Sequence, residues 1–267
     1  MNLRTAQTTA VLAVRAVGKL MRAQLHSNKH ANSVSQHDIK LELDVRSQDL
    51  IEKTLRSKFP DVALLGEEGI VGDPQAEYRW VVDPIDGTVN FAYTIPHACV
   101  SIALQRRATG RGRSVYEDGY ETITGVVYDP FCDEMWTATV GQPARLNGKV
   151  VRVSKRKKLQ EAIVSIGFAK SKESLEATLP YFNQLVFRVR KVRMMGAAAL
   201  ALTYVATGRF DAYIERGIRI WDIAAGGLIV ECAGGEFWRK AVDSNYTYRM
   251  VTSNGLLRRA LKVPWAR

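Results

Sequence analysis

Cysteine and histidine are scarce in this sequence of 267 residues. The chain has three cysteines and four histidines, and no two cysteines lie close enough to form a CxxC pair. An odd number of widely spaced cysteines disfavours both a disulfide framework and a structural zinc site, so we expect reduced thiols. Long apolar runs are also lacking, because the longest, from Gly196 to Gly208, is too short to span a bilayer.

The amino-terminal segment lacks the uninterrupted apolar core of a secretory signal peptide. Three cations, Arg15, Lys19 and Arg22, interrupt its apolar residues. We therefore expect a cytoplasmic protein that does not associate with a membrane.

Negative charge is the minority charge in this chain. The 27 aspartates and glutamates stand against 38 lysines and arginines, which gives a net charge of +11. Hydrophobic residues make up 46% of the chain, enough for a large core, so disorder over most of the length is excluded. The excess of cations predicts an anionic partner, and phosphate esters, nucleic acid and an acidic surface are all compatible with it.

The hydrophobic pattern predicts helices and short strands in two packed halves, residues 1–145 and 146–267. The first half is expected to be α+β and to hold the metal site, and the second to be α/β. Ser47 is expected to cap the second helix. The expected helices are 5–25, 48–58, 197–207 and 223–232, and the expected strands are 63–65, 80–82, 99–104, 122–128, 134–139, 162–166, 187–192 and 212–215.

Two basic segments stand apart from the predicted helices and strands. One is the loop from Arg106 to Gly119, and the other is the run from Lys155 to Lys158. Each is compatible with contact to RNA or to an acidic protein, although a run of charges is more often a solvated surface turn. The sequence leaves both alternatives open.

Several acidic residues follow short apolar runs, where a strand gives way to a loop. Carboxylates with no nearby histidine or cysteine pair favour a hard cation such as Mg²⁺ over Zn²⁺. These acids are Asp44, Glu67, Glu68, Asp83, Asp86 and Asp222.

The densest acidic segment is the hexapeptide from Asp83 to Thr88. Its proline fixes one backbone dihedral and Gly87 permits a tight turn, so both carboxylates can converge with the Ile85 carbonyl on one cation site. Backbone N–H groups of Gly87 and Thr88 would then begin a helical turn, where free N–H groups attract phosphate.

Three motifs resemble the signatures of the inositol monophosphatase family, within the Mg²⁺-dependent, Li⁺-sensitive phosphatase superfamily. They are GEEG at 66–69, DPIDGTVNF at 83–91 and WDIAAGG at 221–227. The resemblance runs from about Asp38 to Gly235 in the order of the family. It implies one compact unit, a layered α-β-α-β-α sandwich of the sugar-phosphatase type.

The resemblance also implies a role for each matching residue. Glu67, Asp83 and the Ile85 carbonyl would hold one Mg²⁺, and Asp83, Asp86 and Asp222 a second, while Glu67 would reach a third ion through water. Thr88, hydrogen-bonded to Asp44, would help to activate the attacking water. The remaining implied residues bind substrate: Gly87 and Thr88 at the phosphate, and Gly196, Ala197 and Glu215 at the organic part.

The implied activity is hydrolysis of inositol monophosphate to myo-inositol and phosphate by a metal-activated water. Fructose 1,6-bisphosphatase and 3′(2′),5′-bisphosphate nucleotidase activities of the same superfamily are alternatives. A different alternative is a regulatory role, in which the basic segments bind RNA or protein. The resemblance further implies inhibition by lithium and a homodimer.

Overall fold

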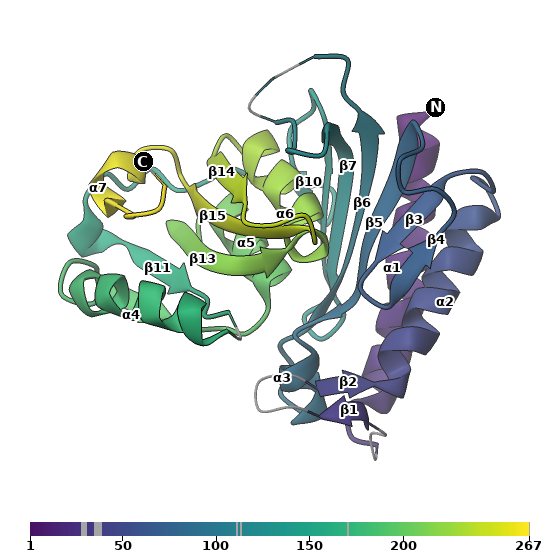
Figure 1. Ribbon diagram of the computed structural model, residues 1–267, viewed down its shortest axis with the longest axis horizontal. Coiled ribbons are helices and arrows are strands. Elements are labelled where there is room, and N and C mark those ends of the chain that lie inside the picture. Colours follow the sequence, from purple (N-terminus) through teal and green to yellow (C-terminus); the bar gives the residue numbers. More distant parts are fainter. Residues whose placement is uncertain (28–30, 35–38, 111, 113, 170, 267) are drawn as a thin grey trace.

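Two β-sheets enclose a pair of helices, and further helices cover the outer face of each sheet (Figure 1). The computed structural model describes residues 1–27, 31–34, 39–110, 112, 114–169 and 171–266. This α-β-α-β-α order confirms the layered sandwich predicted from the sequence. Within the described residues, no helix combines the length and the apolar character needed to cross a membrane.

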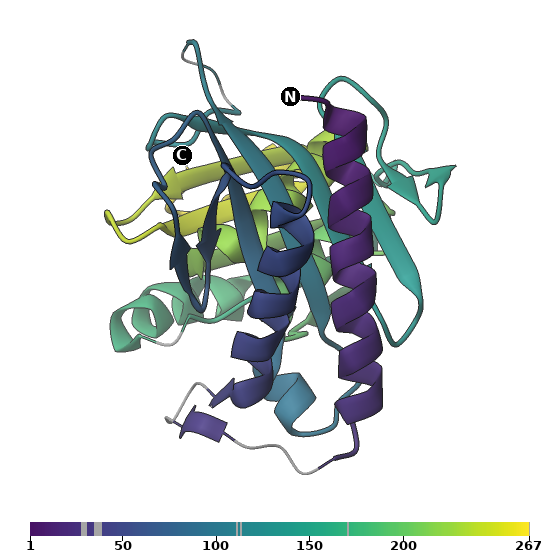
Figure 2. The ribbon, with the colours of Figure 1, turned by 90° about the vertical axis from the view of Figure 1, so that its right-hand side faces the viewer.

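The first outer layer consists of α1 (Leu3–Gln24) and α2 (Glu42–Arg56), which lie side by side on one face of the larger sheet (Figure 2). The expected start of α2 was wrong, because the helix begins five residues before Ser47 and buries Ser47 within it. The cause is Asp44, whose carboxylate accepts a hydrogen bond from the Leu41 N–H at 2.7 Å. That contact places the cap at Leu41, six residues before the expected one.

The larger sheet has eight strands in the order β10-β9-β8-β7-β6-β5-β3-β4. Most neighbours are antiparallel, but β3 and β5 run parallel, so their carboxyl ends meet at one edge. A separate hairpin joins β1 (Ala31–Val34) to β2 (Ile39–Leu41). The eight strands are β3 (Ala63–Gly66), β4 (Gly69–Val71), β5 (Tyr78–Asp86), β6 (Cys99–Arg107), β7 (Tyr120–Asp129), β8 (Glu134–Thr139), β9 (Arg145–Leu146) and β10 (Lys149–Val150).

The central layer is the pair α5 (Ala198–Ala206) and α6 (Ile220–Cys232). Both helices are rich in small residues and buried on most sides, so they pack closely between the two sheets. A Cβ on Gly125 of β7 would lie 2.8 Å from the Ala225 carbonyl oxygen, which leaves room only for glycine there. Helix α6 and strand β7 therefore lie in close contact at this point.

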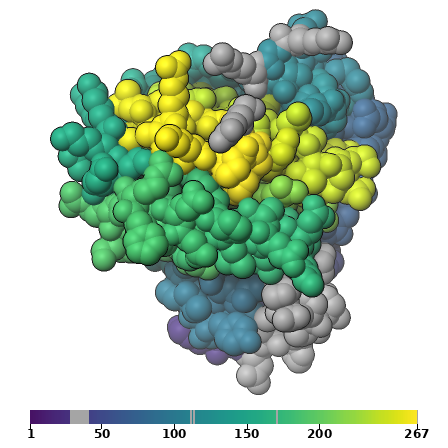
Figure 3. Space-filling view, turned by 60° about the vertical axis from the view of Figure 1, so that its left-hand side comes forward, coloured from purple at the N-terminus to yellow at the C-terminus, as the bar shows by residue number. Residues whose placement is uncertain are grey.

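The smaller sheet has the strand order β12-β11-β13-β15-β14, with α4 (Lys172–Leu185) and the carboxyl-terminal segment side by side on its outer face (Figure 3). The expected strand at 187–192 was misplaced, because its first residues form the turn after α4. The strands are β11 (Ile163–Ile166), β12 (Lys191–Arg193), β13 (Ala212–Arg219), β14 (Glu236–Ala241) and β15 (Thr247–Ser253), and the short helices are α3 (Thr88–Ala92), η1 (Leu159–Glu161) and α7 (Arg258–Leu261).

The described residues of the loop between β6 and β7 are mostly exposed or partly exposed, as expected, but part of the loop packs against the smaller sheet. Its Tyr116 is buried, and the guanidinium carbon of Arg239 in β14 lies 3.6 Å from the centre of the Tyr116 ring. Glu117 accepts a hydrogen bond from the Ala241 N–H at 2.9 Å. Arg106 forms an ion pair with Glu121 at 2.5 Å, whereas Arg111 and Arg113 lie outside the described residues. The loop thus joins the two sheets.

Candidate active site

The first two predicted ligands lie at the shared end of two parallel strands. Glu67 follows β3 and donates its backbone N–H to the Val82 carbonyl of β5 at 3.2 Å. Asp83, the next residue of β5, is buried. Burial raises the pKa of Asp83 well above its ordinary value, and the charges of Glu67, Asp86 and Asp222 raise it further. The four acids therefore belong to one electrostatic cluster.

The end of β5 departs from regular pairing where it carries its two aspartates. The register with β6 shifts between Asp83 and Asp86, and an Asp83 carboxylate oxygen accepts a hydrogen bond from the Ile85 N–H at 3.0 Å. Proline at position 84 has no N–H to offer a neighbouring strand. Carboxylate oxygens of Asp83, Asp86 and Asp222 consequently lie within 4.8 Å of one another.

Asp222 reaches this cluster from the first turn of α6. Its carboxylate accepts a hydrogen bond from the Arg219 N–H at 2.9 Å, so it also caps the helix. Asp83 and Asp222 share a further side-chain hydrogen bond, which raises the pKa of Asp83. Residues 139 positions apart are thus held together by a strand end and a helix start.

The Asp86 carboxylate is held by the start of α5. It accepts hydrogen bonds from the backbone N–H groups of Ala198 at 3.0 Å and Ala199 at 2.7 Å. The Cys99 thiol donates a weaker one across 3.5 Å. Burial raises the pKa of Asp86 to about 7, although these three hydrogen bonds act in the opposite direction. Two backbone donors fix both oxygens of this side chain.

Gly87 and Thr88 form the turn from β5 into the short α3. Gly87 has a φ of 89°, and a Cβ there would lie 3.0 Å from the His97 carbonyl oxygen. Both facts require glycine. The Thr88 hydroxyl donates to the Ile85 carbonyl at 2.9 Å, while Asp44 accepts from Leu41 as described above. The expected hydrogen bond between Thr88 and Asp44 stays a prediction.

Asn90, which was not among the predicted site residues, ties the turn to the segment before α5. Its amide donates to the carbonyl oxygens of His97 at 2.9 Å and Met195 at 2.8 Å. The second contact places Gly196 and Ala197, both predicted to line the substrate site, next to the Gly87 turn. A sequence signal existed, because Asn90 lies inside the DPIDGTVNF motif.

Gln48, also missed, holds the loop that carries Glu67 and Glu68. It is buried on α2 one turn after Asp44, and its carbonyl oxygen accepts the Glu68 N–H at 3.0 Å. Its amide donates to the Gly69 carbonyl at 3.3 Å. The spacing of four residues from Asp44 could have placed Gln48 on the same helix face.

Glu215, the predicted substrate residue of β13, lies beside Tyr213 and Gly167. The Tyr213 hydroxyl donates to the Glu215 carboxylate. Burial raises the pKa of Tyr213 well above its ordinary value and the charge of Glu215 raises it further, so the hydroxyl stays protonated and can donate. A Cβ on Gly167 would overlap the carboxylate, only 1.9 Å from one of its oxygens. The position of Glu215 is therefore restricted on two sides.

The family model described as the inositol monophosphatase family matches residues 2–254. This match covers every residue of the acidic cluster and both helix starts. The chain belongs to the inositol monophosphatase family.

Individual relatives in this family carry two kinds of name. A protein of Xylella fastidiosa named Nus factor SuhB is 39% identical to this chain. The aligned region covers 84% of this chain and 78% of that protein. Inositol monophosphatase 1 of Solanum lycopersicum is 37% identical to this chain. The aligned region covers 85% of this chain and 81% of that protein. In shape, the chain is similar to the crystal structure of extragenic suppressor protein suhB from Bartonella henselae. That match has a TM-score of 0.84 at 30% identity and covers 96% of this chain and 98% of the other.

Family membership and the acidic cluster together support phosphatase chemistry. A phosphorylated small molecule suits the family as a substrate, and a carboxylate cluster can hold a cation beside a phosphate group. The names of the relatives differ, so they do not by themselves select the substrate of this chain.

Proposed function

We propose that this protein is a Mg²⁺-dependent phosphomonoesterase that hydrolyses inositol monophosphate to myo-inositol and phosphate. The observation that carries the proposal is the meeting of Asp83, Asp86 and Asp222 within 4.8 Å. Oxygen-only donors suit a hard divalent cation. The family and the plant relatives named inositol monophosphatase support the substrate.

The residues of the cluster fit Mg²⁺ in charge as well as in donor type. Burial raises the pKa values of Asp83 and Asp86, which means that the ionised carboxylates lack enough positive charge around them. A divalent cation would supply that charge. Asp83, Asp86 and Asp222 would hold it, with Glu67 and the Ile85 carbonyl as proposed further ligands for two or three ions in all. When bound, Mg²⁺ acidifies water and stabilises the leaving oxygen.

The chain itself would orient the reacting groups. Ala198 and Ala199 hold the Asp86 carboxylate through their N–H groups, and Asn90 anchors the turn that presents Gly87 and Thr88. We infer that the backbone N–H groups of this turn bind the substrate phosphate. Thr88 would hold the attacking water, with Asp44 as its partner. Fixed donors of this kind need no rearrangement when charge develops in the transition state.

The organic part of the substrate would lie between Gly196, Ala197 and Glu215. Tyr213 donates to the Glu215 carboxylate, and a carboxylate can accept several hydrogen bonds, so we infer that Glu215 also accepts from hydroxyl groups of the substrate. A polyhydroxylated ring such as inositol supplies those donors. Fructose 1,6-bisphosphate and 3′-phosphoadenosine 5′-phosphate remain alternatives, since both also carry hydroxyl groups.

A substrate panel tests the proposal directly. Phosphate release from inositol 1-phosphate, fructose 1,6-bisphosphate and 3′-phosphoadenosine 5′-phosphate is measured with Mg²⁺, with Mg²⁺ plus Li⁺, and with EDTA. We expect the highest kcat/KM for inositol 1-phosphate, inhibition by Li⁺ and no activity in EDTA. A higher kcat/KM for either of the other two substrates would overturn the substrate assignment. Activity in EDTA would overturn the proposal that the reaction needs Mg²⁺.

The name of the Xylella fastidiosa relative, Nus factor SuhB, supports a second candidate, a regulatory role in binding RNA or an acidic protein. Reversing the charge of Arg106, Arg107, Arg111 and Arg113 tests whether the β6–β7 loop takes part. We expect weaker retention on RNA at low salt with phosphatase activity unchanged, and no retention of the unaltered chain would end the idea. The homodimer and the cytoplasmic location also stay predictions.

A further inference from the structure

A hollow away from the acidic cluster is lined by all five cations of residues 152–158. Its volume is about 610 Å³, and it is lined by five cations against one acid, Glu161. Among the described residues, Arg156 forms an ion pair with Asp211 at 2.9 Å, and the other four cations have no acidic partner. These four are Arg152, Lys155, Lys157 and Lys158, and all are exposed.

The floor of this hollow is rigid although it contains neither helix nor strand. Asp211 is fully buried and accepts hydrogen bonds from Ser154, from Arg156 at 2.9 Å and from the Ile163 N–H at 2.8 Å. The Asn254 amide donates to Ser154 and to the Arg156 carbonyl, both at 2.9 Å. The cations therefore project from a fixed backbone, which reduces the entropy lost on binding a ligand.

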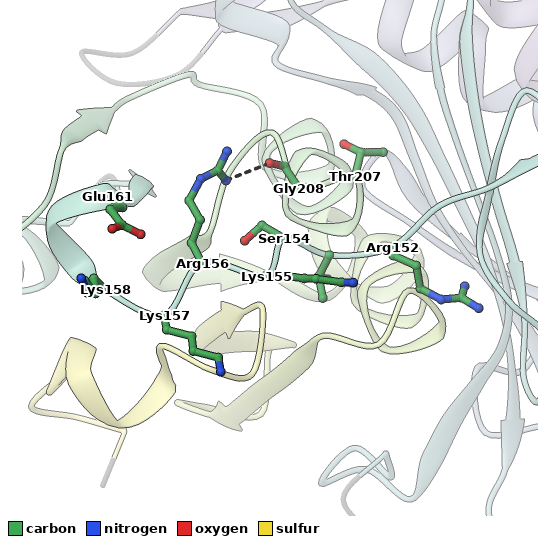
Figure 4. A pocket seen from close by; sticks show the side chains of 10 residues that line it. Arg152, Ser154, Lys155, Arg156, Lys157, Lys158, Glu161, Thr207 and Gly208 are labelled. Carbon is green, nitrogen blue, oxygen red and sulfur yellow. Dashed lines mark hydrogen bonds between the residues drawn. The ribbon is translucent and has the colours of Figure 1, made fainter.

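The opposite wall is the carboxyl end of α5. Arg156 donates to the Gly208 carbonyl at 3.2 Å, and Thr207 lies beside it (Figure 4). A Cβ on Gly208 would come within 3.1 Å of the Ser154 nitrogen, so glycine permits this close approach. The nine residues of α5 rise about 13 Å, and Asp86 binds their other end. The hollow is thus separate from the acidic cluster.

The chemistry of the lining points to phosphate groups without stacked bases. Lysine and arginine are the usual partners of phosphate oxygens. The hollow is wide open to solvent, so charge and not enclosure would hold a ligand there. None of the lining residues is aromatic, whereas surfaces for single-stranded nucleic acid commonly stack bases on aromatic side chains. A neighbouring hollow of about 310 Å³, lined by Arg156, Glu161, Ile163 and Arg190, extends the cationic surface.

We propose that the hollow at residues 152–158 binds a small anion that carries two or more phosphate groups. Several unpaired cations around one cavity match several linked phosphates better than a single one. This site is independent of the proposed phosphatase activity, because it shares no residue with the acidic cluster.

Inorganic tripolyphosphate is the probe, and titration calorimetry on the metal-free full-length chain is the measurement. Without Mg²⁺ the acidic cluster repels polyanions, so tripolyphosphate binding at that cluster does not add to the binding measured at the hollow. We expect one site per chain and at least about ten-fold weaker binding of orthophosphate, which forms fewer ion pairs. Absence of tripolyphosphate binding, or equal affinity for orthophosphate, would overturn the proposal.

Two triple variants place the site. Lys155→Gln, Lys157→Gln and Lys158→Gln together should weaken tripolyphosphate binding roughly ten-fold. Lys19→Gln, Lys53→Gln and Lys58→Gln remove the same charge from exposed lysines on or beside α1 and α2, and should change it less than two-fold. Equal losses in both variants would mean non-specific attraction and would refute the site. If a 20-nucleotide RNA binds at residues 155–158 and tripolyphosphate does not displace it, the surface is an RNA interface instead.

Discussion

The Asp86 carboxylate caps helix α5 by accepting the backbone N–H of Ala199 at 2.7 Å. Ala197, at the cap position of α5, has no side chain that could do so. An aspartate at the end of one strand therefore accepts the free N–H groups at the start of α5. The first of these donors, Ala198, lies 112 residues later in the chain. The same side chain belongs to the acidic cluster, so the start of α5 and the proposed metal site have a common anchor.

Replacing Asp86 with asparagine should lower phosphatase activity strongly in a chain that stays folded, although one N–H of α5 loses its acceptor. Asparagine keeps the size of the side chain and one acceptor for α5, but it removes the charge that a cation needs. We expect kcat/KM to fall at least about 100-fold, and the rise in Tm on adding Mg²⁺ to disappear. The matched control is Asp49→Asn on the exposed side of α2, which should change neither. Activity near that of the unaltered chain would rule out Asp86 as a ligand.

The stability of the metal-free chain should fall as pH rises from 4 to 8. Burial raises the pKa of Asp86 from its ordinary value of 3.8 to about 7. Between these values the unfolded chain loses a proton that the folded chain keeps, so the unfolded state binds fewer protons and stability decreases with pH. We expect Tm to fall by at least about 3 °C between pH 5 and pH 8 from this group.

Saturating Mg²⁺ supplies the control for this pH dependence. Because a cation favours the ionised carboxylates, Mg²⁺ should raise Tm more at pH 8 than at pH 5. Scanning calorimetry at both pH values, with and without Mg²⁺, measures the difference. An equal shift at both values would mean that the cluster does not exchange protons for the metal.

The sequence predicted the acids of the site better than the contacts that hold them. Glu67 follows β3, Asp83 lies near the end of β5 after the apolar residues 80–82, and Asp222 lies in the WDIAAGG motif, so short apolar runs and motifs pointed to these acids. The capping of α5 by Asp86 and the link from Asn90 to Met195 span 112 and 105 residues. Contacts of such separation depend on packing that no local pattern contains.

The errors in the fold also arise from long-range contacts and from local exceptions. The described part of the β6–β7 loop is mostly exposed or partly exposed, as its arginines indicated, but its Tyr116 is buried and packs on Arg239 of the other sheet. Helix α4 was not among the expected helices, and it contains Pro180, which lacks the N–H that a helix interior normally uses. Asp44 started α2 early through a side-chain contact that the spacing of apolar residues does not encode.

Removing the Asn90 amide should loosen the proposed phosphate-binding turn and destabilise the protein. In Asn90→Ala the carbonyl oxygens of His97 and Met195 each lose their donor. We expect the free energy of unfolding in urea to drop by about 2 kcal/mol and kcat to fall more than KM rises. Asn183→Ala, on the exposed side of α4, should leave both nearly unchanged. A loss of stability without any change in kcat would restrict Asn90 to a structural role.

Adding one methyl group at Gly167 should alter substrate recognition while sparing the metal site. The new Cβ in Gly167→Ala would overlap a Glu215 oxygen, only 1.9 Å away, so the carboxylate must swing aside. Because a hydrogen bond from a substrate hydroxyl to a charged acceptor would be lost, we expect KM for inositol 1-phosphate to rise roughly ten-fold, with kcat changed less than about three-fold. Gly110→Ala, where nothing lies within 4 Å of the added atom, is the control. Hydrolysis of a phosphate ester without ring hydroxyls should be unaffected by Gly167→Ala, and a KM for inositol 1-phosphate equal to that of the control would exclude Glu215 from the substrate site.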